Sequence, residues 1–160
     1  MKIFNTENFL EHKTTMRVVK NFKENKEIPE SIKVTESLEK LGFRFPEVVM
    51  AQAIHETAHF TSNIYIYCNN LFGMKFNERG YAIGVCREHA EYANKRDSIK
   101  DYLAYQKKYL TYYEKNVIRR TCLTNEDYHK FLLWIGYAED DDYISKIKVY
   151  EEAIKEESTL

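Results

Sequence analysis

The sequence predicts a mainly α-helical (α+β) domain with a small β-hairpin in its middle. Apolar residues recur at helical spacing over most of the 160 residues, and only five glycines and two prolines are present. Tight turns favour these two residues, so their scarcity argues against an all-β fold. With 44% hydrophobic and 31% charged residues, the chain has the composition of a globular protein that buries a core.

Three helices are expected before the hairpin. Their predicted ranges are 6–21, 29–42 and 46–60. The second and third each begin with a proline, which is favoured at the first position of a helix, and the second ends at a glycine.

The helical period breaks between residues 69 and 94. Turn signals such as Asn69-Asn70 surround an alternation of Tyr81, Ile83 and Val85 that is typical of a short strand. This region therefore predicts a hairpin or an extended loop.

Three further helices are expected after the hairpin. The first begins at Asp97 or Ser98 and runs to Leu110, the second covers 124–135, and the third covers 139–150. Thr124 and Asp127 form a variant of the capping box, and Gly136 ends that helix. The only tryptophan, Trp134, lies in the apolar run of the second helix, so we expect it in the core. Residues 1–160 are expected to form a single domain.

Charge and hydropathy give no sign of a nucleic-acid partner, a membrane span or a signal peptide. The formal net charge is −1, which gives no overall electrostatic reason to expect nucleic acid as a partner. No stretch approaches the roughly 18 apolar residues of a membrane span. Residues 1–13 are too polar to form the apolar part of a signal peptide.

The three cysteines, Cys68, Cys86 and Cys122, include no CxxC pair. An odd number fits neither a complete disulfide framework nor a four-thiolate zinc site. The simplest interpretation is free buried thiols in a chain made in a reducing compartment.

Glu56 is the first residue whose chemistry does not match its surroundings. It shares a helical face with Val49, Ala53 and Phe60, so a carboxyl group lies on an otherwise apolar stripe. Burial disfavours the charged form and raises the pKa of a carboxyl, which suits a general acid.

The run from His55 to His59 also matches the zinc motif HExxH. On a helix, two histidines four residues apart face one zinc ion, and the glutamate between them acts as a general base. The longer form of the motif has Gly and His where Ser62 and Tyr65 stand. A third zinc ligand would have to come from a distant residue such as Glu78, Glu88 or Glu91. A zinc peptidase that uses His55, Glu56 and His59 therefore stays an alternative.

A longer set of residues resembles glycoside hydrolase family 73, the bacterial glucosaminidases. Residues 51–58 resemble the family's AQ-x-x-x-E-[ST] helix, and residues 69–75, NNLFGMK, resemble its most specific block. Later matches in the same order are Tyr92, Ser98-Ile99, Asp101-Tyr102, Gly136-Tyr137-Ala138, Asp140 and Tyr143. The resemblance covers residues 45 to about 150. The histidines of the HETAH run are unusual for the family, and the segment between Lys75 and Tyr92 is shorter than in many members.

The resemblance implies a lysozyme-like domain with a catalytic core at 45–150 and N-terminal helices at 1–44. It implies hydrolysis of the β-1,4 bond after N-acetylglucosamine in peptidoglycan, with no metal or cofactor. The glycan strand would be the partner, and we expect no nucleic acid, no membrane and a monomer. Without a signal peptide, the chain would be made in the cytoplasm and reach the wall after lysis or by another delivery system. A non-catalytic wall-binding module is a further alternative.

The resemblance also implies roles for single residues. Glu56 would be the general acid, and Tyr137 would hydrogen-bond the substrate near the cleaved bond. For the second carboxylate we choose Glu88 over Glu78 and Glu91. A mechanism in which the acetamido group of the substrate replaces this carboxylate stays open.

Three residues are candidates for substrate binding, each with a structural alternative. Asn70 could instead hold the turn after the catalytic helix, because side-chain amides bond nearby backbone groups. Phe72 could stack on a sugar or lie in the core. His59, one turn after Glu56, could line the site or have only a structural role.

Overall fold

The computed structural model describes residues 38 and 40–158, which form five helices and one hairpin. The predicted helix 6–21 and most of the predicted helix 29–42 lie outside the described residues. In chain order the elements are α3 (Pro46–Glu56), α4 (Asn63–Cys68), β1 (Gly84–Cys86), β2 (His89–Glu91), α5 (Lys95–Asn116), α6 (Asn125–Ile135) and α7 (Tyr143–Ser158). The mainly α-helical fold with a small hairpin is confirmed.

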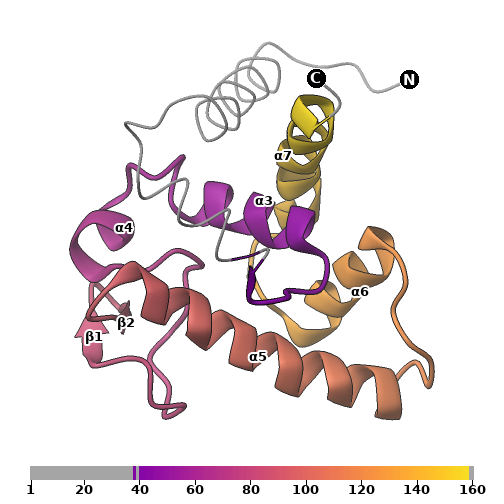
Figure 1. Cartoon of the computed structure of the whole chain (residues 1–160), viewed down its shortest axis with the longest axis horizontal. Coiled ribbons are helices and arrows are strands. Elements are labelled where there is room, and N and C mark those ends of the chain that lie inside the picture. The colour runs from indigo at the N-terminus through magenta and orange to yellow at the C-terminus, as the bar shows by residue number, and fades with distance from the viewer. Residues whose placement is uncertain (1–37, 39, 159–160) are drawn as a thin grey trace.

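The long helix α5 forms one side of the domain, and α3 and α7 pack together on the other (Figure 1). Helix α4 and the antiparallel pair β1–β2 lie at the N-terminal end of α5. At its C-terminal end, α5 connects to α6. The core between these elements is rich in aromatic rings, and Phe72, Tyr102, Tyr128 and Phe131 have no exposed surface.

Several predicted helix ends are confirmed. Pro46 lies in the first turn of α3, and Thr124 and Asp127 form a complete capping box at the start of α6. Gly136 ends α6 in the left-handed conformation, with φ 67°. Helix α5 begins a little earlier than predicted, because the Asn94 side chain accepts a hydrogen bond from the Asp97 N–H at 2.9 Å.

Two segments differ from the prediction around the third helix. Helix α3 ends at Glu56 instead of residue 60, and residues 58–60 all have positive φ. The short helix α4 was not predicted; it begins after Ser62, whose hydroxyl accepts from the backbone of Tyr65. The last helix also begins later than predicted, at Tyr143.

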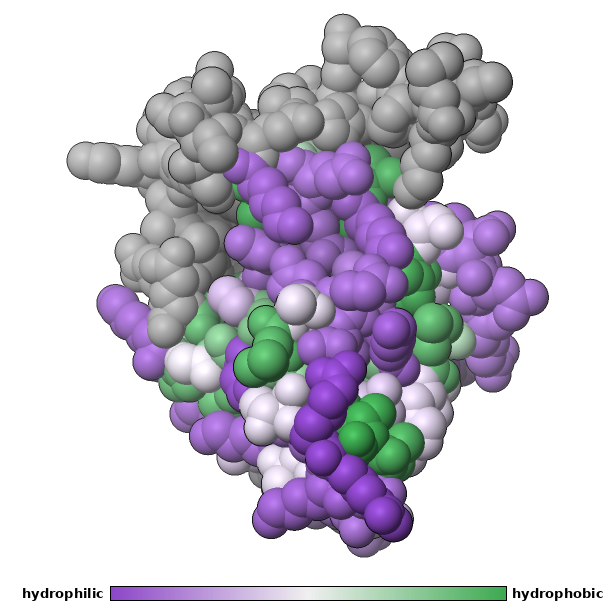
Figure 2. Space-filling model, turned by 90° about the vertical axis from the view of Figure 1, so that its right-hand side faces the viewer, coloured by the Kyte–Doolittle hydropathy of each residue, from purple (hydrophilic) through white to green (hydrophobic). Residues whose placement is uncertain are grey.

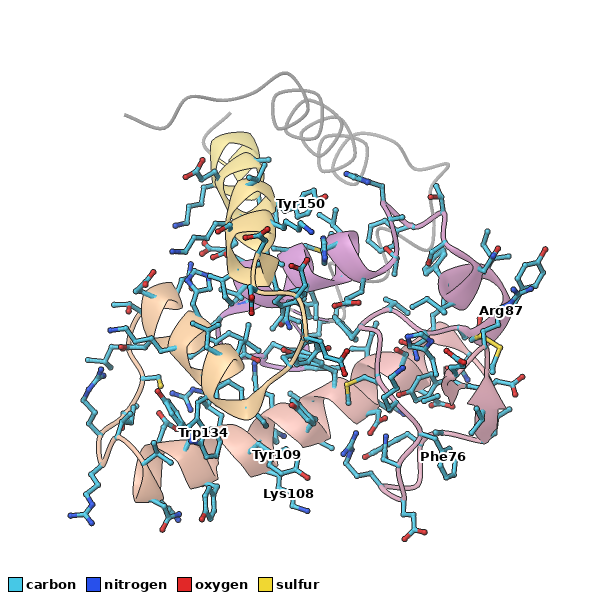
Figure 3. All side chains as sticks on the ribbon, turned by 180° about the vertical axis from the view of Figure 1, so that it is seen from behind. Phe76, Arg87, Lys108, Tyr109, Trp134 and Tyr150 are labelled. Atoms are coloured by element: carbon cyan, nitrogen blue, oxygen red, sulfur yellow. A yellow bond between two sulfur atoms is a disulfide. The ribbon has the colours of Figure 1, made fainter. Side chains whose placement is uncertain are left out.

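The prediction that Trp134 lies in the core is wrong. Its side chain is 44% exposed and stacks against Tyr112 on the surface, at the end of α5 opposite the hairpin (Figure 3). Successive residues of a helix point about 100° apart, so an apolar run of this length cannot be buried throughout. Phe131 and Leu132 face the core, and Leu133 and Trp134 face solvent. Hydrophobic side chains on the side of the molecule that includes α6 form separate groups among hydrophilic ones (Figure 2).

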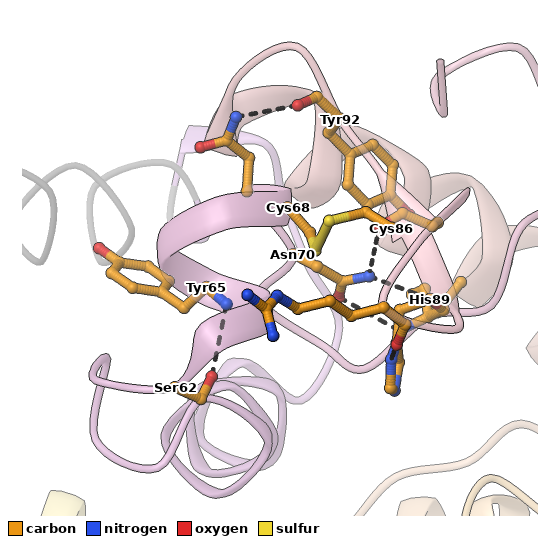
Figure 4. The surroundings of a disulfide bond; sticks show 11 residues. Ser62, Tyr65, Cys68, Asn70, Cys86, His89 and Tyr92 are labelled. Carbon is orange, nitrogen blue, oxygen red and sulfur yellow. Dashed lines mark hydrogen bonds between the residues drawn. A yellow bond between two sulfur atoms is a disulfide. The ribbon is translucent and has the colours of Figure 1, made fainter. Parts of the chain in front are cut away.

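The prediction of three free thiols is also wrong. Cys68, at the end of α4, forms a disulfide with Cys86 in β1, 18 residues away, and only Cys122 is a free buried thiol (Figure 4). Spacing along the chain did not indicate this pair, because the two residues meet only when the hairpin folds back against α4. Among the described residues, no helix is long and apolar enough to cross a membrane.

We predict that replacing both residues of the pair, Cys68→Ser with Cys86→Ser, lowers the free energy of unfolding by about 3 kcal/mol. A crosslink that closes a loop of this length restricts the unfolded chain by that amount. Denaturant unfolding with and without a reductant measures it, and Cys122→Ala is the control for losing a buried thiol. The reductant should destabilise the wild type and Cys122→Ala but leave the double variant unchanged. Equal sensitivity of all three proteins would contradict the prediction.

Candidate active site

Glu56 is the last residue of α3, at a sharp turn of the chain. The Thr57 hydroxyl donates to the Ala53 carbonyl at 2.6 Å and accepts from the Phe60 N–H at 2.9 Å, which replaces the next helical hydrogen bonds. A carboxylate at the C-terminal end of a helix faces the negative end of the helix dipole. The position of Glu56 therefore disfavours its charged form.

The backbone of Gly73 lies directly against the Glu56 carboxyl. A Cβ atom added at Gly73 would lie 2.5 Å from Glu56 Oε2, and Gly73 has a φ of +68°. Both the close approach and the positive φ require glycine here. The NNLFGMK block therefore supplies one wall of the Glu56 site.

Asn70 holds this wall in place. Its side-chain amide donates to the carbonyls of Met74 and Ala90 at 3.0 and 2.9 Å, and its oxygen accepts from the backbone N–H groups of Phe72 and Met74. Ala90 also donates its N–H to the Met74 carbonyl at 2.9 Å. One buried side chain thus fixes the turn around Gly73 and joins it to β2 (Figure 4).

The pKa of Glu56 is raised to about 7. Burial is the largest cause, since it removes the carboxyl from water. Two groups act in the opposite direction by stabilising the charged form: a hydrogen bond from the Tyr143 hydroxyl and the positive charge of Lys75. With this pKa the carboxyl is about half protonated at neutral pH, and the protonated share grows as the pH falls.

Lys75 links this region to the hairpin. Its ammonium group donates to the backbone carbonyl of Glu88 at 3.2 Å and is close enough to Glu56 to lower the pKa of that carboxyl. Arg87 and Glu88 form the turn between β1 and β2, with φ values of 50° and 66°. The Glu88 side chain is exposed.

The two other candidates for the second carboxylate lie elsewhere. Glu78 is exposed in the segment before β1. Glu91 is half-buried in β2, opposite Gly84. The structure thus brings the turn at Glu88 into the region of Glu56 through Lys75.

Tyr137 lies close enough to Glu56 for the charge of that carboxyl to raise the Tyr137 pKa, and its hydroxyl contacts the protein itself. It donates to the Phe72 carbonyl at 2.5 Å, and its ring stacks on Tyr143 at 5.8 Å between centroids. Burial is the main reason that the pKa of Tyr137 lies well above its usual value, and the Glu56 charge raises it further. The phenol therefore keeps its proton.

Two of the substrate-binding candidates need correction. Phe72 has no exposed surface and packs on Tyr102 at 4.5 Å between centroids, so the core alternative is right and stacking on a sugar is wrong. Asn70 is also fully buried, and its amide bonds the backbone, so the turn-holding alternative is right.

The histidines do not form the zinc helix that the HETAH run suggested. Because α3 ends at Glu56 and His59 has a φ of 59°, His55 and His59 are not one turn apart on a helix. Their rings lie against Tyr150 of α7, at 6.0 and 5.4 Å between centroids, in the region shown in Figure 3. Burial lowers the pKa of His55. No group of three His, Cys, Asp or Glu side chains among the described residues could hold a metal ion.

Three residues of the site were not predicted as such: Gln52, Gly73 and Tyr143. Gln52 lies one helical turn before Glu56 and donates to the Tyr143 hydroxyl at 3.1 Å. Gln52 could have been found from the sequence, because it is a polar residue four positions before Glu56 on the same apolar helical face. Gly73 and Tyr143 both belong to the motifs that carried the resemblance, but the motifs alone did not say what they contact.

Comparisons with known proteins agree with this geometry. The model of the glucosaminidase family, described as mannosyl-glycoprotein endo-beta-N-acetylglucosaminidase, matches residues 32–156. Among solved structures, the catalytic domain of the autolysin Auto from Listeria monocytogenes is 17% identical, with a TM-score of 0.55 over 99% of each chain. This likeness supports the same fold. None of the curated proteins matches the chain.

We predict that Gly73→Ala destabilises the protein by at least about 1 kcal/mol more than Gly42→Ala. Both glycines have similar positive φ values, 68° and 72°, so both substitutions carry the same backbone cost of about 1–2 kcal/mol. Only at Gly73 would the new methyl group meet a carboxyl, whereas nothing lies within 4 Å at Gly42. Denaturant unfolding of the two variants measures the difference, and equal losses would show that the carboxyl moves aside without cost.

Proposed function

The chain belongs to the glucosaminidase family of peptidoglycan hydrolases, and we propose that it cleaves the β-1,4 bond that follows N-acetylglucosamine, with Glu56 as general acid. The observation that carries the proposal is the Glu56 carboxyl, enclosed at the end of α3 with its pKa raised to about 7. Glycoside hydrolysis needs a carboxylic acid that still holds its proton at the working pH, to protonate the leaving oxygen.

The surroundings of Glu56 support this role. Burial and the helix end keep the group protonated, while Tyr143 and Lys75 stabilise the carboxylate that remains after the proton has moved to the sugar. An acid needs both: it must hold its proton before the step and tolerate the charge after it. The tyrosines beside it keep their own protons, since burial raises the pKa of both Tyr137 and Tyr143.

For the second half of the reaction we propose Glu88 as the general base on water. Its carbonyl is bonded by Lys75, the same cation that acts on Glu56. Glu88 also occupies a left-handed backbone position with φ 66°, where glycine or asparagine would be favoured in a two-residue turn. A glutamate kept at an unfavourable backbone position is consistent with a role outside folding. An inverting mechanism would need about 6.5–9.5 Å between the two carboxyl groups, to leave space for the water.

Tyr137 and His59 stay our candidates for contacts to the glycan strand. The Tyr137 hydroxyl uses its proton on the Phe72 carbonyl, but its oxygen can still accept a hydrogen bond from a sugar N–H or O–H. His59 is half-buried on the turn that follows Glu56.

We predict that the purified protein releases fragments of peptidoglycan with N-acetylglucosamine at the reducing end, and that Glu56→Gln releases none above background. Mass spectrometry of borohydride-reduced products identifies that sugar. Glutamine keeps the size of the side chain and removes the proton, so folding should be retained. Because the charged form is disfavoured in the fold, Glu56→Gln should also be more stable than the wild type above pH 7, by up to about 3 kcal/mol. Reduced muramic acid ends would show that the protein cleaves the other glycosidic bond of the strand. An active Glu56→Gln variant would exclude Glu56 as the acid.

We predict that Glu88→Gln lowers kcat by roughly 10²- to 10⁴-fold, the usual contribution of a positioned general base. Glu78→Gln and Glu91→Gln are the matched controls and should stay within about 10-fold of the wild type. Glu88→Gly adds a second readout, because glycine relieves the positive φ of the turn while it removes the carboxylate. This variant should be as stable as the wild type, or more so, and as inactive as Glu88→Gln. If all these variants stay active, the substrate's acetamido group takes the place of the base; a large loss in Glu91→Gln alone would move the role to Glu91.

A further inference from the structure

We propose that a one-way chain of hydrogen-bond donors through the core holds the Tyr143 O–H on the Glu56 carboxyl, so that Tyr143 is a positioning residue for the acid. The inference rests on the proposed function, because it assumes that Glu56 is the acid. The members of this donor chain, from its remote end to the site, are Gln106, Tyr128, Tyr102, Gln52 and Tyr143, and all of them are buried.

The direction of the donor chain is set at its remote end by a backbone contact. The Gln106 side-chain oxygen accepts from the Arg44 N–H at 3.0 Å, and its amide nitrogen donates to the Arg44 carbonyl at 2.8 Å. This double contact determines which end of the Gln106 amide is oxygen and which is nitrogen. The same nitrogen donates to the Tyr128 hydroxyl at 3.1 Å. The Tyr128 oxygen is therefore an acceptor, and its own proton is free to point elsewhere.

That proton points to Tyr102. The two hydroxyl oxygens are 2.7 Å apart, and either could be the donor from geometry alone. Tyr102 donates its own proton to the side-chain oxygen of Gln52, so Tyr128 must be the donor of the pair. With its oxygen engaged in this way, Gln52 directs its amide nitrogen at the Tyr143 hydroxyl, 3.1 Å away.

The Tyr143 hydroxyl thus accepts a hydrogen bond from Gln52. Its own O–H donates a hydrogen bond to the Glu56 carboxyl. The reverse direction would have one hydrogen bond fewer and would leave two groups without a partner. If Gln52 were turned around, it would accept from Tyr143, and the Glu56 carboxyl would lose its donor. Tyr102 would then donate to Tyr128, whose proton would have no acceptor among the hydrogen bonds of the described residues. Unsatisfied buried hydroxyls are costly, so the forward direction is strongly favoured.

The consequence for Glu56 is a permanent donor that does not titrate. Burial keeps the pKa of Tyr143 well above its usual value, so this phenol stays protonated at any working pH. The other groups that act on or face the Glu56 carboxyl are Lys75 and the Tyr137 phenol. While Tyr143 donates to one carboxyl oxygen, the proton for the sugar is carried by the other. The donor chain therefore opposes the effect of burial and fixes which oxygen is the acid.

The test compares the basic limb of the pH profile of kcat/KM, on soluble glycan fragments, in Tyr143→Phe and Tyr102→Phe. Tyr143→Phe removes the donor itself, and loss of a bond to the charged form raises the pKa of an acid. Tyr102→Phe acts at a distance: it removes the donor to the Gln52 oxygen and so weakens the contacts that fix the orientation of the Gln52 amide. In Tyr143→Phe the basic limb should move to higher pH by about one pH unit. In Tyr102→Phe it should move in the same direction by a smaller amount, because Gln52 can still donate to Tyr143. The double variant should shift no further than Tyr143→Phe.

Tyr113→Phe is the matched control, since it removes the hydroxyl of another buried tyrosine, on the same helix as Tyr102 but outside the donor chain. Its basic limb should stay where the wild type has it. A ¹³C NMR titration of the Glu56 carboxyl in the same variants reports the same shift without relying on activity. Tyr102→Phe and Tyr143→Phe profiles that lose amplitude but keep the wild-type limb and the wild-type Glu56 pKa would overturn the donor chain. If the carboxyl titration shifts as expected but Glu56→Gln remains active, the donor chain stands and the proposed function fails.

Discussion

A carboxyl group at the end of a helix and the backbone of a glycine approach each other in this protein so closely that no side chain fits between them. The rest of the site depends on this contact. Thr57 ends α3 so that Glu56 faces the loop, and Asn70 holds Gly73 against it. Burial is the main cause of the raised pKa of this carboxyl, and the Gly73 backbone covers part of it. The close approach that shapes the loop therefore also contributes to the burial on which the proposed role of Glu56 as an acid depends.

Hydrogen bonds within the core give the buried hydroxyls of Tyr102, Tyr128 and Tyr143 their partners. A buried phenol must find a partner for its hydroxyl, and a core that contains several can satisfy them most economically by joining them in one network. Here the network starts at the backbone of Arg44 and ends at the Glu56 carboxyl. Because each member has only one way to satisfy both of its neighbours, the backbone at one side of the domain determines the orientation of a hydroxyl at the other.

The hairpin is held by contacts that differ from those of the core. It has only three residues in each strand, too few to be stable alone. Its positions are fixed by the Cys68–Cys86 disulfide, by Asn70 and by the bond from Lys75 to the turn at Glu88. Each of these contacts begins in residues 68–75, at and directly after the end of α4. The two sides of the site are thus connected through the NNLFGMK loop and its flanks, and a change in that loop should affect both.

By itself, the sequence determined the helical class and several helix ends, and it singled out Glu56 as the candidate acid. These depend on local rules: period, proline and glycine at helix ends, the capping box at Thr124, and a carboxyl on an apolar stripe. The motif around residues 69–75 determined the family, which the match over residues 32–156 confirms. Glu56 could be found because its side chain contradicts its own local surroundings.

The tertiary structure decided what local rules do not contain. Cys68 and Cys86 form a pair, and HETAH is no zinc helix, because the chain turns at Thr57 and folds back at the hairpin. Phe72 lies inside and Trp134 outside because burial depends on which face of each segment meets a neighbour, and not on how apolar the residue is. Tyr143 hydrogen-bonds Glu56 although the two residues are 87 positions apart in the sequence. No spacing rule applies over such a separation. Sequence specifies the groups that carry the chemistry, and packing alone decides which of them meet.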